Sequence, residues 1–488
     1  MPSKNSIKEF LFKNTTNKQT FAKNTFWLGA SEVSGRLLKM GLIIYAARVL
    51  GADGWGTFSY ALSVASLLMI FSDIGLGGLI TREIVQEKDG HVNFISTAIF
   101  LKNIVLAASL VLVIVICPII SNIPSANTLF PLVAVIFLFD ALRELGFSIN
   151  RAREKMEREM SGKTIMSIVI LVLGILLLQI NAEPRSIAIA YAVGSAVGFI
   201  IILSMIKSDV KKLLFNIDKK LLTTILKTTW PFAVITLIGS IMANTDIYML
   251  GIWRGASDIG LYASVQRIQQ FILIIPSMIA TASFPLLSRL AHEEGARFTE
   301  VLEKTMAFSL TIVIPIVVGG VLLADKIIPF VFGAEYMGAV PIFQILMIML
   351  VTAFPLVLLS NAIFSFNKQK ELVLAYTIGI VANVLINIAM IPSLGAVGSA
   401  IATCISTTVV TVYIWHKMKK ISNFEVVPKL GKGLVATLVM ALSIIALRLT
   451  SINTIVVMIL SSGIYFYALY IMKESVFNEA LKIIKNKS

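Results

Sequence analysis

Cationic side chains lie inside several long apolar runs of this chain, where a bilayer would make them costly. Arg36, Lys39, Lys102, Arg143 and Arg267 all fall well inside such runs. A charge at the centre of a membrane costs about 2.5–3.5 kcal/mol on insertion scales. A chain that keeps these charges must give them partners or water. The residues therefore predict a membrane protein with a polar interior.

The first apolar run carries three charges on one face. Glu32, Arg36 and Lys39 are spaced by four and three residues, which places them on the same side of a helix. Glu32 and Arg36 can pair, but Lys39 crowds Arg36 and leaves an excess of positive charge that favours an anion. A second cluster consists of Arg143 with Asp140 and Glu144 on either side of it. A structural role is favoured for this cluster, because its charges can neutralise one another between helices.

Composition excludes several classes of protein. Of 488 residues, 57% are hydrophobic and 14% are charged, against about a quarter in soluble domains. Cys117 and Cys404 lie in apolar runs and the three histidines are scattered, so we expect no disulfide framework and no metal site. No phosphate-binding loop of the G-x-x-x-x-G-K-[ST] type occurs, so the sequence favours neither a nucleotide cofactor nor ATP hydrolysis. We expect a protein that is not an enzyme.

Hydropathy predicts an all-α polytopic protein of about fourteen transmembrane helices. Their expected spans are 25–50, 54–80, 92–120, 127–149, 164–180, 186–206, 229–250, 258–287, 304–323, 338–363, 371–391, 395–415, 433–449 and 454–472. With the N-terminus inside, only Arg185, Arg254 and Lys326 of the 42 Lys and Arg residues fall in outward loops. This strong positive-inside bias predicts cytoplasmic termini, and it explains the net charge of +15 without a nucleic-acid partner.

A short motif recurs six predicted spans apart. Gly51-Ala52-x-x-x-Gly56 returns as Gly255-Ala256-x-x-x-Gly260. Because six is even, the two repeats have the same orientation, which predicts two six-helix lobes related by a pseudo-two-fold axis along the membrane normal. The expected parts are a cytoplasmic tail (1–24), an N-terminal lobe (25–206), a cytoplasmic linker (207–228), a C-terminal lobe (229–415), and two extra helices with a cytoplasmic tail (416–488).

Four stretches of the chain resemble the polysaccharide exporter branch of the multidrug/oligosaccharidyl-lipid/polysaccharide superfamily. They are LGADGWGTFSYALSVASLLMIFSDIGLGGLITREI (50–84), GLYASVQRIQQFILIIPSMIATASFPLLSRL (260–290), VFGAEYMGAVPIFQIL (331–346) and FNKQKELVLAYTIGIVANVLINIAMIPSLGAVGSAIATCIS (366–406). The pieces stand in family order and spacing. The resemblance implies a two-lobed helical transporter in the cytoplasmic (inner) membrane.

The resemblance further implies a flippase for undecaprenyl-diphosphate-linked oligosaccharide repeat units of O-antigen, capsule or exopolysaccharide. Such a cargo needs cations for its diphosphate and hydrogen-bonding groups for its sugars. The expected cationic lining is Arg36, Lys39, Lys102, Arg143 and Arg267. The expected sugar contacts are Asn244, Gln266, Gln269 and Gln270, and the carboxylates expected to couple transport to H⁺ or Na⁺ are Glu32, Asp140 and Asp246.

Other functions stay open at this point. A lipid II flippase has the same number of spans, so the span count does not separate it from a repeat-unit flippase. A drug or cation antiporter typically has twelve spans and would favour an acidic cavity. A non-transporting scaffold for a polymer-synthesis complex is a third class, and a polysaccharide polymerase complex is an expected partner of the flippase as well.

Overall fold

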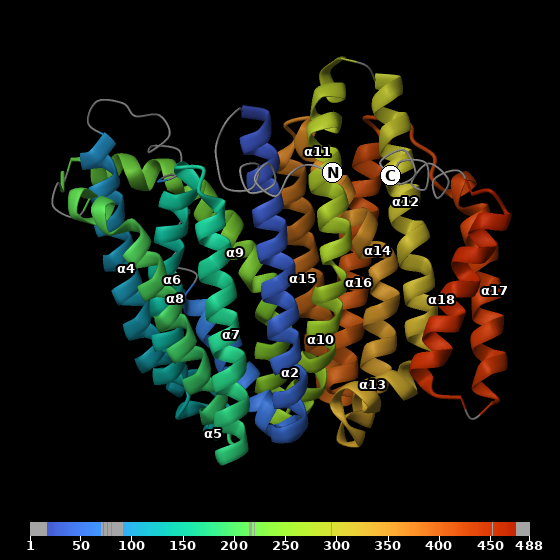
Figure 1. Ribbon diagram of the computed structural model, residues 1–488, viewed down its shortest axis with the longest axis horizontal. Helices are drawn as coiled ribbons and strands as arrows, with labels where there is room; N and C mark the ends of the chain where they lie inside the picture. The colour runs from blue at the N-terminus through green and yellow to red at the C-terminus, as the bar shows by residue number, and fades with distance from the viewer. Residues whose placement is uncertain are drawn as a thin grey trace, which may run out of the picture. The chain divides into compact units, whose positions relative to one another are not determined.

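A computed structural model describes residues 17–69, 72, 76, 80, 91–213, 217–218, 220–293, 295–450 and 452–474, apart from some side chains in these helices. Every regular element among these residues is helical, so the expected all-α class is confirmed (Figure 1). Contacts divide the chain into two compact units, Met1–Gly260 and Leu261–Ser488. The expected division at the linker 207–228 stays a prediction. The helix that follows this linker belongs to the first unit by its contacts.

The first unit is built from long helices and one short turn. In chain order these are α2 (Asn17–Met69), α4 (His91–Ile120), α5 (Pro124–Asn127), α6 (Phe130–Ala152), α7 (Met156–Ile180), α8 (Pro184–Leu213) and α9 (Leu221–Trp253). Helix α2 begins inside the segment that was expected to be a cytoplasmic tail. It is interrupted at Gly51, whose φ of 66° and ψ of 179° are not helical. The boundary expected between the spans 25–50 and 54–80 is therefore a break at a single residue, where glycine tolerates a positive φ.

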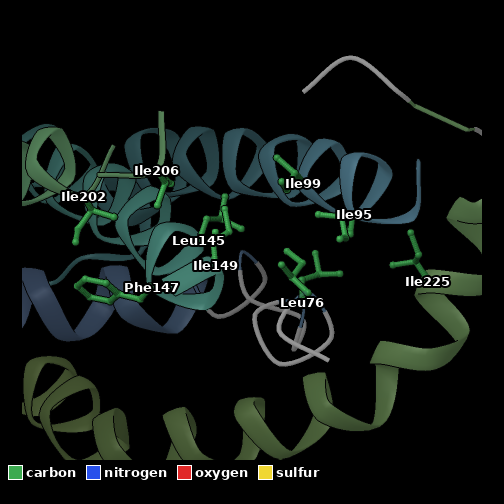
Figure 2. Packing of buried hydrophobic residues seen from close by; sticks show 11 residues of the cluster. Leu76, Ile95, Ile99, Leu145, Phe147, Ile149, Ile202, Ile206 and Ile225 are labelled. Atoms are coloured by element: carbon green, nitrogen blue, oxygen red, sulfur yellow. The ribbon is translucent and has the colours of Figure 1, made fainter. Parts of the chain in front are cut away.

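A cluster of branched apolar side chains holds part of this unit together (Figure 2). It joins α4, α6, α8 and α9 through Ile95, Leu145, Ile202 and Ile225, all of which are buried. Gly146 lets α8 approach α6, since a Cβ there would lie 2.1 Å from Ile202 Cγ2. This packing positions the charged ends of α6 and α7 described below.

The two repeated glycine motifs meet inside the first unit. A Cβ on Gly56 would lie 1.7 Å from the carbonyl oxygen of Ala256, and a Cβ on Gly260 would lie 1.8 Å from that of Ala52. Backbone therefore packs directly on backbone at both positions. The contact is reciprocal, because each motif offers its second glycine to the alanine of the other.

Helix α10 (Ala256–Ile272) crosses the boundary into the second unit. That unit continues with α11 (Ile274–Glu293), α12 (Gly295–Leu322), α13 (Ala324–Phe332), η2 (Ala334–Ala339), α14 (Val340–Ser365), α15 (Gln369–Leu394), α16 (Ala396–Lys419), η3 (Val427–Leu430), α17 (Gly431–Arg448) and α18 (Thr454–Ile471). The last two helices form a hairpin that packs through α17 on α12. Prolines stand inside α11, α12, α13, α14 and α15.

Within the described residues, ten helical segments are long and apolar enough to cross a membrane. They are Val92–Ile120, Met156–Ile180, Pro184–Ile206, Ala256–Glu293, Gly295–Leu322, Ala334–Ser365, Gln369–Leu394, Ala396–Lys419, Val427–Arg448 and Thr454–Ile471. The other expected spans fall on α2, α6 and α9 or on residues near 70–80 that lie partly outside the described residues. The polytopic architecture is confirmed, whereas the total of fourteen spans and the two-lobe symmetry stay predictions.

Candidate functional site

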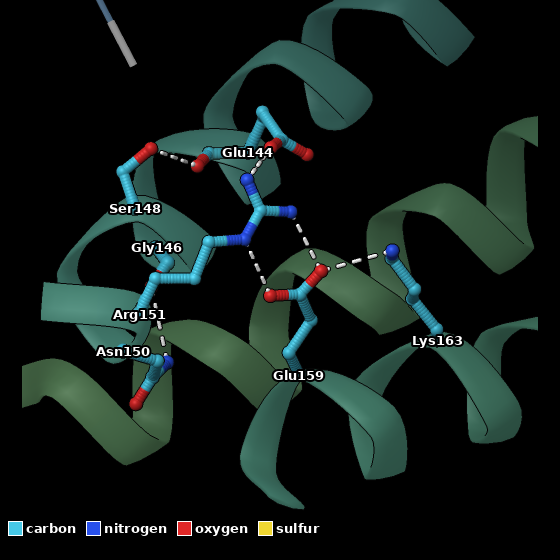
Figure 3. Close-up of polar contacts among 7 residues, drawn as sticks. All are labelled: Glu144, Gly146, Ser148, Asn150, Arg151, Glu159 and Lys163. Atoms are coloured by element: carbon cyan, nitrogen blue, oxygen red, sulfur yellow. Dashed lines mark hydrogen bonds and ion pairs between the residues drawn. The ribbon is translucent and has the colours of Figure 1, made fainter. Parts of the chain in front are cut away.

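An ion network joins the end of α6 to the start of α7 (Figure 3). Arg151 donates from Nε and Nη2 to both carboxylate oxygens of Glu159, at 2.7 and 2.6 Å. Its Nη1 lies 2.9 Å from Glu144, and Lys163 lies 2.9 Å from Glu159. The short connection between α6 and α7 brings these residues together, with Glu154 at a positive φ of 56°.

Glu159 is the centre of this network, because its side chain is 0% exposed. A buried carboxylate is tolerated only when cations and hydrogen bonds replace its water. Here the bidentate guanidinium of Arg151 and the ammonium of Lys163 do so on two sides. The network therefore ties the end of α6 to the start of α7 through charged side chains.

Arg143 occupies a separate pocket of the same unit, one turn from Phe147. It pairs with Asp140 at 2.5 Å and lies 2.7 Å from Met166 Sδ, and it is 9% exposed. Its guanidinium stacks over the Phe147 ring at 5.6 Å, and Lys163 approaches the same ring at 5.4 Å. The predicted neutralisation of Arg143 by Asp140 is thus observed, whereas Glu144 pairs with Arg151 instead.

The remaining charged candidates of the first unit lie on α2, α4 and α9. Arg36 is exposed, Lys39 is partly exposed and Lys102 is buried, with 1% exposure. Asp246 on α9 is also buried, at 3%. Glu32 belongs to α2, but its side chain lies outside the described residues. Ligand and coupling roles for all of them stay predictions.

The amide candidates group mainly on α10. Gln266 and Gln269 are both 8% exposed, and Arg267 Nη1 donates to Gln270 Oε1 at 3.1 Å. This pair brings one predicted phosphate contact next to one predicted sugar contact. Asn244, on α9, donates instead to the Ser240 carbonyl of its own helix at 2.9 Å.

The second unit contains an apolar cavity of about 550 Å³. Its wall comes from α11, α12, α17 and α18, and the side chains around it are mainly aliphatic and aromatic. They are Ile275, Phe308, Thr311, Ile312, Pro315, Ile316, Met440, Ser462, Tyr465, Phe466, Leu469 and Glu474. A space of this size and polarity can hold part of a hydrocarbon chain.

Sequence reasoning missed the importance of residues 150–163 and of Lys23. It counted them as cytoplasmic loop or tail charges, yet Lys23 is 1% exposed and contacts Glu157 at 3.2 Å. The available signal was the i,i+4 spacing of Glu159 and Lys163 at the entry of an apolar run. Spacing alone could not reveal that the same carboxylate also receives Arg151.

Comparison with known proteins identifies the family of the chain. The profile of a family described as "Polysaccharide biosynthesis protein" matches residues 21–291, which is more than half of the sequence. The chain belongs to the polysaccharide biosynthesis protein family. The resemblance to polysaccharide exporters drawn from residues 50–84 and 260–290 is thereby confirmed.

Two similar proteins align with this chain along most of their length. A probable low-salt glycan biosynthesis flippase, Agl15 of Haloferax volcanii, is 24% identical over 91% of this chain and 93% of its own. A putative O-antigen transporter of Shigella flexneri is 23% identical over 78% of this chain and 93% of its own.

Solved structures show the fold of this polysaccharide biosynthesis protein. The inward closed conformation of the lipid II flippase MurJ is similar with a TM-score of 0.76 at 19% identity, over 92% of this chain and 98% of that one. An inward-facing multidrug resistance MATE family transporter of the MOP superfamily gives a TM-score of 0.64 at 15% identity, over 77% and 94%. At these identities the likeness establishes a MurJ- and MATE-like helical fold.

Proposed function

We propose that the protein is a flippase that carries a polyprenyl-diphosphate-linked oligosaccharide repeat unit across the cytoplasmic membrane. The observation that carries this proposal is the family membership, reinforced by a flippase-named relative aligned over 93% of its length. The carrier lipid is undecaprenyl diphosphate in a bacterial host. The repeat unit is destined for O-antigen, capsule or exopolysaccharide.

The chemistry of such a cargo assigns a task to each candidate group. Arg36, Lys39, Lys102, Arg143 and Arg267 neutralise the diphosphate. Asn244, Gln266, Gln269 and Gln270 bind sugar hydroxyls. The hydrocarbon tail, which needs only apolar surface, fits the 550 Å³ cavity between α12 and α18.

Movement occurs by alternating access of two six-helix lobes, with α17 and α18 as an addition. The reciprocal contact of Gly56 with Ala256 and of Gly260 with Ala52 supports the proposed two-fold relation. Glu32, Asp140 or Asp246 couples the cycle to H⁺ or Na⁺. Both termini face the cytoplasm, and a polysaccharide polymerase complex receives the product outside.

The test is complementation of a strain that lacks its repeat-unit flippase. The wild-type gene should restore surface polymer and remove lipid-linked repeat units from the cytoplasmic leaflet. Arg36→Ala and Arg267→Ala should reduce surface polymer at least tenfold at normal protein level and membrane insertion. Lys326→Ala, which removes a cation outside the candidate set on α13, is the matched control and should behave as wild type. Surface polymer at the wild-type level in both arginine variants would favour a scaffold role instead.

A lipid II flippase is the second candidate, because the MurJ fold covers 92% of the chain. Depletion of the host lipid II flippase separates the two candidates. Rescue of growth by this gene without an effect on surface polymer would overturn the repeat-unit proposal. A drug-sensitivity panel on overexpression tests the antiporter alternative, for which we expect no change.

A further inference from the structure

Pro315 interrupts the hydrogen-bond ladder of α12 in the second unit. A proline has no backbone N–H, so the carbonyl four residues earlier, that of Thr311, loses its helical partner. Inside a bilayer an unsatisfied carbonyl costs several kcal/mol, because no water replaces the lost donor. The Thr311 carbonyl therefore requires a donor from elsewhere.

Tyr465 of α18 supplies that donor. Its hydroxyl donates to the Thr311 carbonyl oxygen at 2.6 Å, across 154 residues of sequence, and the bond is buried. The Tyr465 side chain itself is 4% exposed. One hydrogen bond thus satisfies both a carbonyl freed by proline and a hydroxyl placed among apolar side chains.

Further polar contacts attach η3, the segment before it and the end of α17 to α12 and α13. Lys429 of η3 and the backbone N–H of Glu425 both reach the carboxylate of Glu303 on α12, at 2.5 and 2.6 Å. Arg448, the last residue of α17, donates to the Leu322 carbonyl oxygen at the end of α12 and pairs with Asp325 of α13 at 2.8 Å. These charge pairs are partly exposed and therefore contribute little. The bond of Tyr465 differs from them because it is buried.

We propose that Tyr465 is a positioning residue: it stabilises the proline-interrupted turn of α12 and makes the α17–α18 hairpin a brace that moves with α12. Tyr465, Thr311 and Pro315 also line the apolar cavity. The brace therefore sets the shape of that cavity. The consequence for transport rests on the proposed flippase function, whereas the brace itself does not.

A double-mutant cycle on the purified full-length protein tests the brace. Tyr465→Phe should lower the apparent melting temperature by about 1 °C, the shift expected from about 1 kcal/mol at this chain length. Tyr470→Phe, on the same helix but 60% exposed, is the matched control and should leave it unchanged. Equal melting temperatures for the two variants would overturn the proposal.

The second part of the cycle replaces Pro315, so that residue 315 regains a backbone N–H. In a Pro315→Ala background the Thr311 carbonyl regains a helical donor, so Tyr465→Phe should cause at most half of its original shift. Pro315→Gly restores the same N–H and runs the same cycle if the alanine variant does not fold. Additive shifts of the melting temperature would show that the effect of Tyr465→Phe does not depend on whether the Thr311 carbonyl has a helical donor. That result would contradict the proposal.

The transport arm uses the complementation strain. Tyr465→Phe should reduce surface polymer several-fold at equal protein level, and Pro315→Ala should recover it in the double variant. Wild-type polymer in Tyr465→Phe would reject the positioning role while leaving the flippase function intact. Failure of the wild-type gene itself to restore polymer would instead reject the flippase function. The melting temperatures of the variants would still show whether Tyr465 stabilises α12.

Discussion

The two units bury polar groups of different kinds. In Met1–Gly260 the buried set includes the charged residues Lys23, Lys102, Arg143, Glu159 and Asp246. In the described part of Leu261–Ser488 it consists of hydroxyls and amides, with Glu474 as the one charged residue.

The difference follows from the cost of each kind of contact. When one partner of a buried ion pair is removed or moves away, the other charge is left buried and uncompensated, which is costly. A network of buried charges therefore fixes the geometry of the helices that carry it. A hydroxyl bond between membrane helices is worth about 0.6 kcal/mol, so helices held in this way can shift more cheaply. The comparison suggests a first unit held by its charges and a second unit with more freedom to adjust, except where Tyr465 holds α12.

The largest expected effect comes from neutralising Glu159. Glu159→Gln removes the buried carboxylate that Arg151 and Lys163 share and should destabilise the protein by about 3 kcal/mol, the lower end of the range for a broken buried pair, because both cations are partly exposed and Arg151 keeps Glu144. Thermal unfolding of the purified protein, or its steady-state level in membranes, measures the loss. Glu300→Gln is the matched control from the second unit, because Glu300 forms a comparable 2.9 Å pair with Lys304 on an exposed surface. Similar losses of stability in Glu159→Gln and Glu300→Gln would contradict the inference that the buried charge contributes more than the exposed one.

A smaller effect should follow from filling a glycine contact, which tests whether the first unit is held by packing as well as by charge. Gly56→Ala places a methyl group against the Ala256 carbonyl and should cost about 1–3 kcal/mol, the range for overpacked sites. Gly255→Ala adds the same methyl group where nothing lies within 4 Å, and serves as the control. Thermal unfolding of both variants should show a clear fall only for Gly56→Ala, and an unchanged value there would contradict the close approach.

The smallest effect should come from a hydroxyl of the second unit. Thr411 Oγ1 lies 3.2 Å from the Thr352 carbonyl oxygen on α14 and 2.8 Å from that of Thr407 on its own helix. Thr411→Val keeps the shape and should cost about 0.6 kcal/mol. Thr377→Val, which removes an exposed hydroxyl on α15, provides the baseline. A loss as large as that of Glu159→Gln would mean that the second unit is as tightly held as the first.

Several features of the fold and of the site could be predicted from sequence. The break at Gly51 falls at the expected boundary between the spans 25–50 and 54–80, and Asp140 was recognised as a neighbour that could neutralise Arg143. Both predictions concern residues close in the chain, where helical geometry limits what can meet. The burial of Lys23 was not predicted, because its partner Glu157 lies on α7, 134 residues away in the sequence.

Sequence alone determined that the chain is a helical membrane protein, since apolar runs of about 20 residues must satisfy their backbone as helices. The exporter type followed from the resemblance of four stretches to a known family. Tertiary structure decided which distant groups meet. The sequence shows that Pro315 frees a carbonyl, but only the packing of α18 on α12 brings Tyr465 to it. The physical reason is that backbone needs are local and are met within one helix, whereas the partner of a buried polar side chain comes from whichever helix packs beside it.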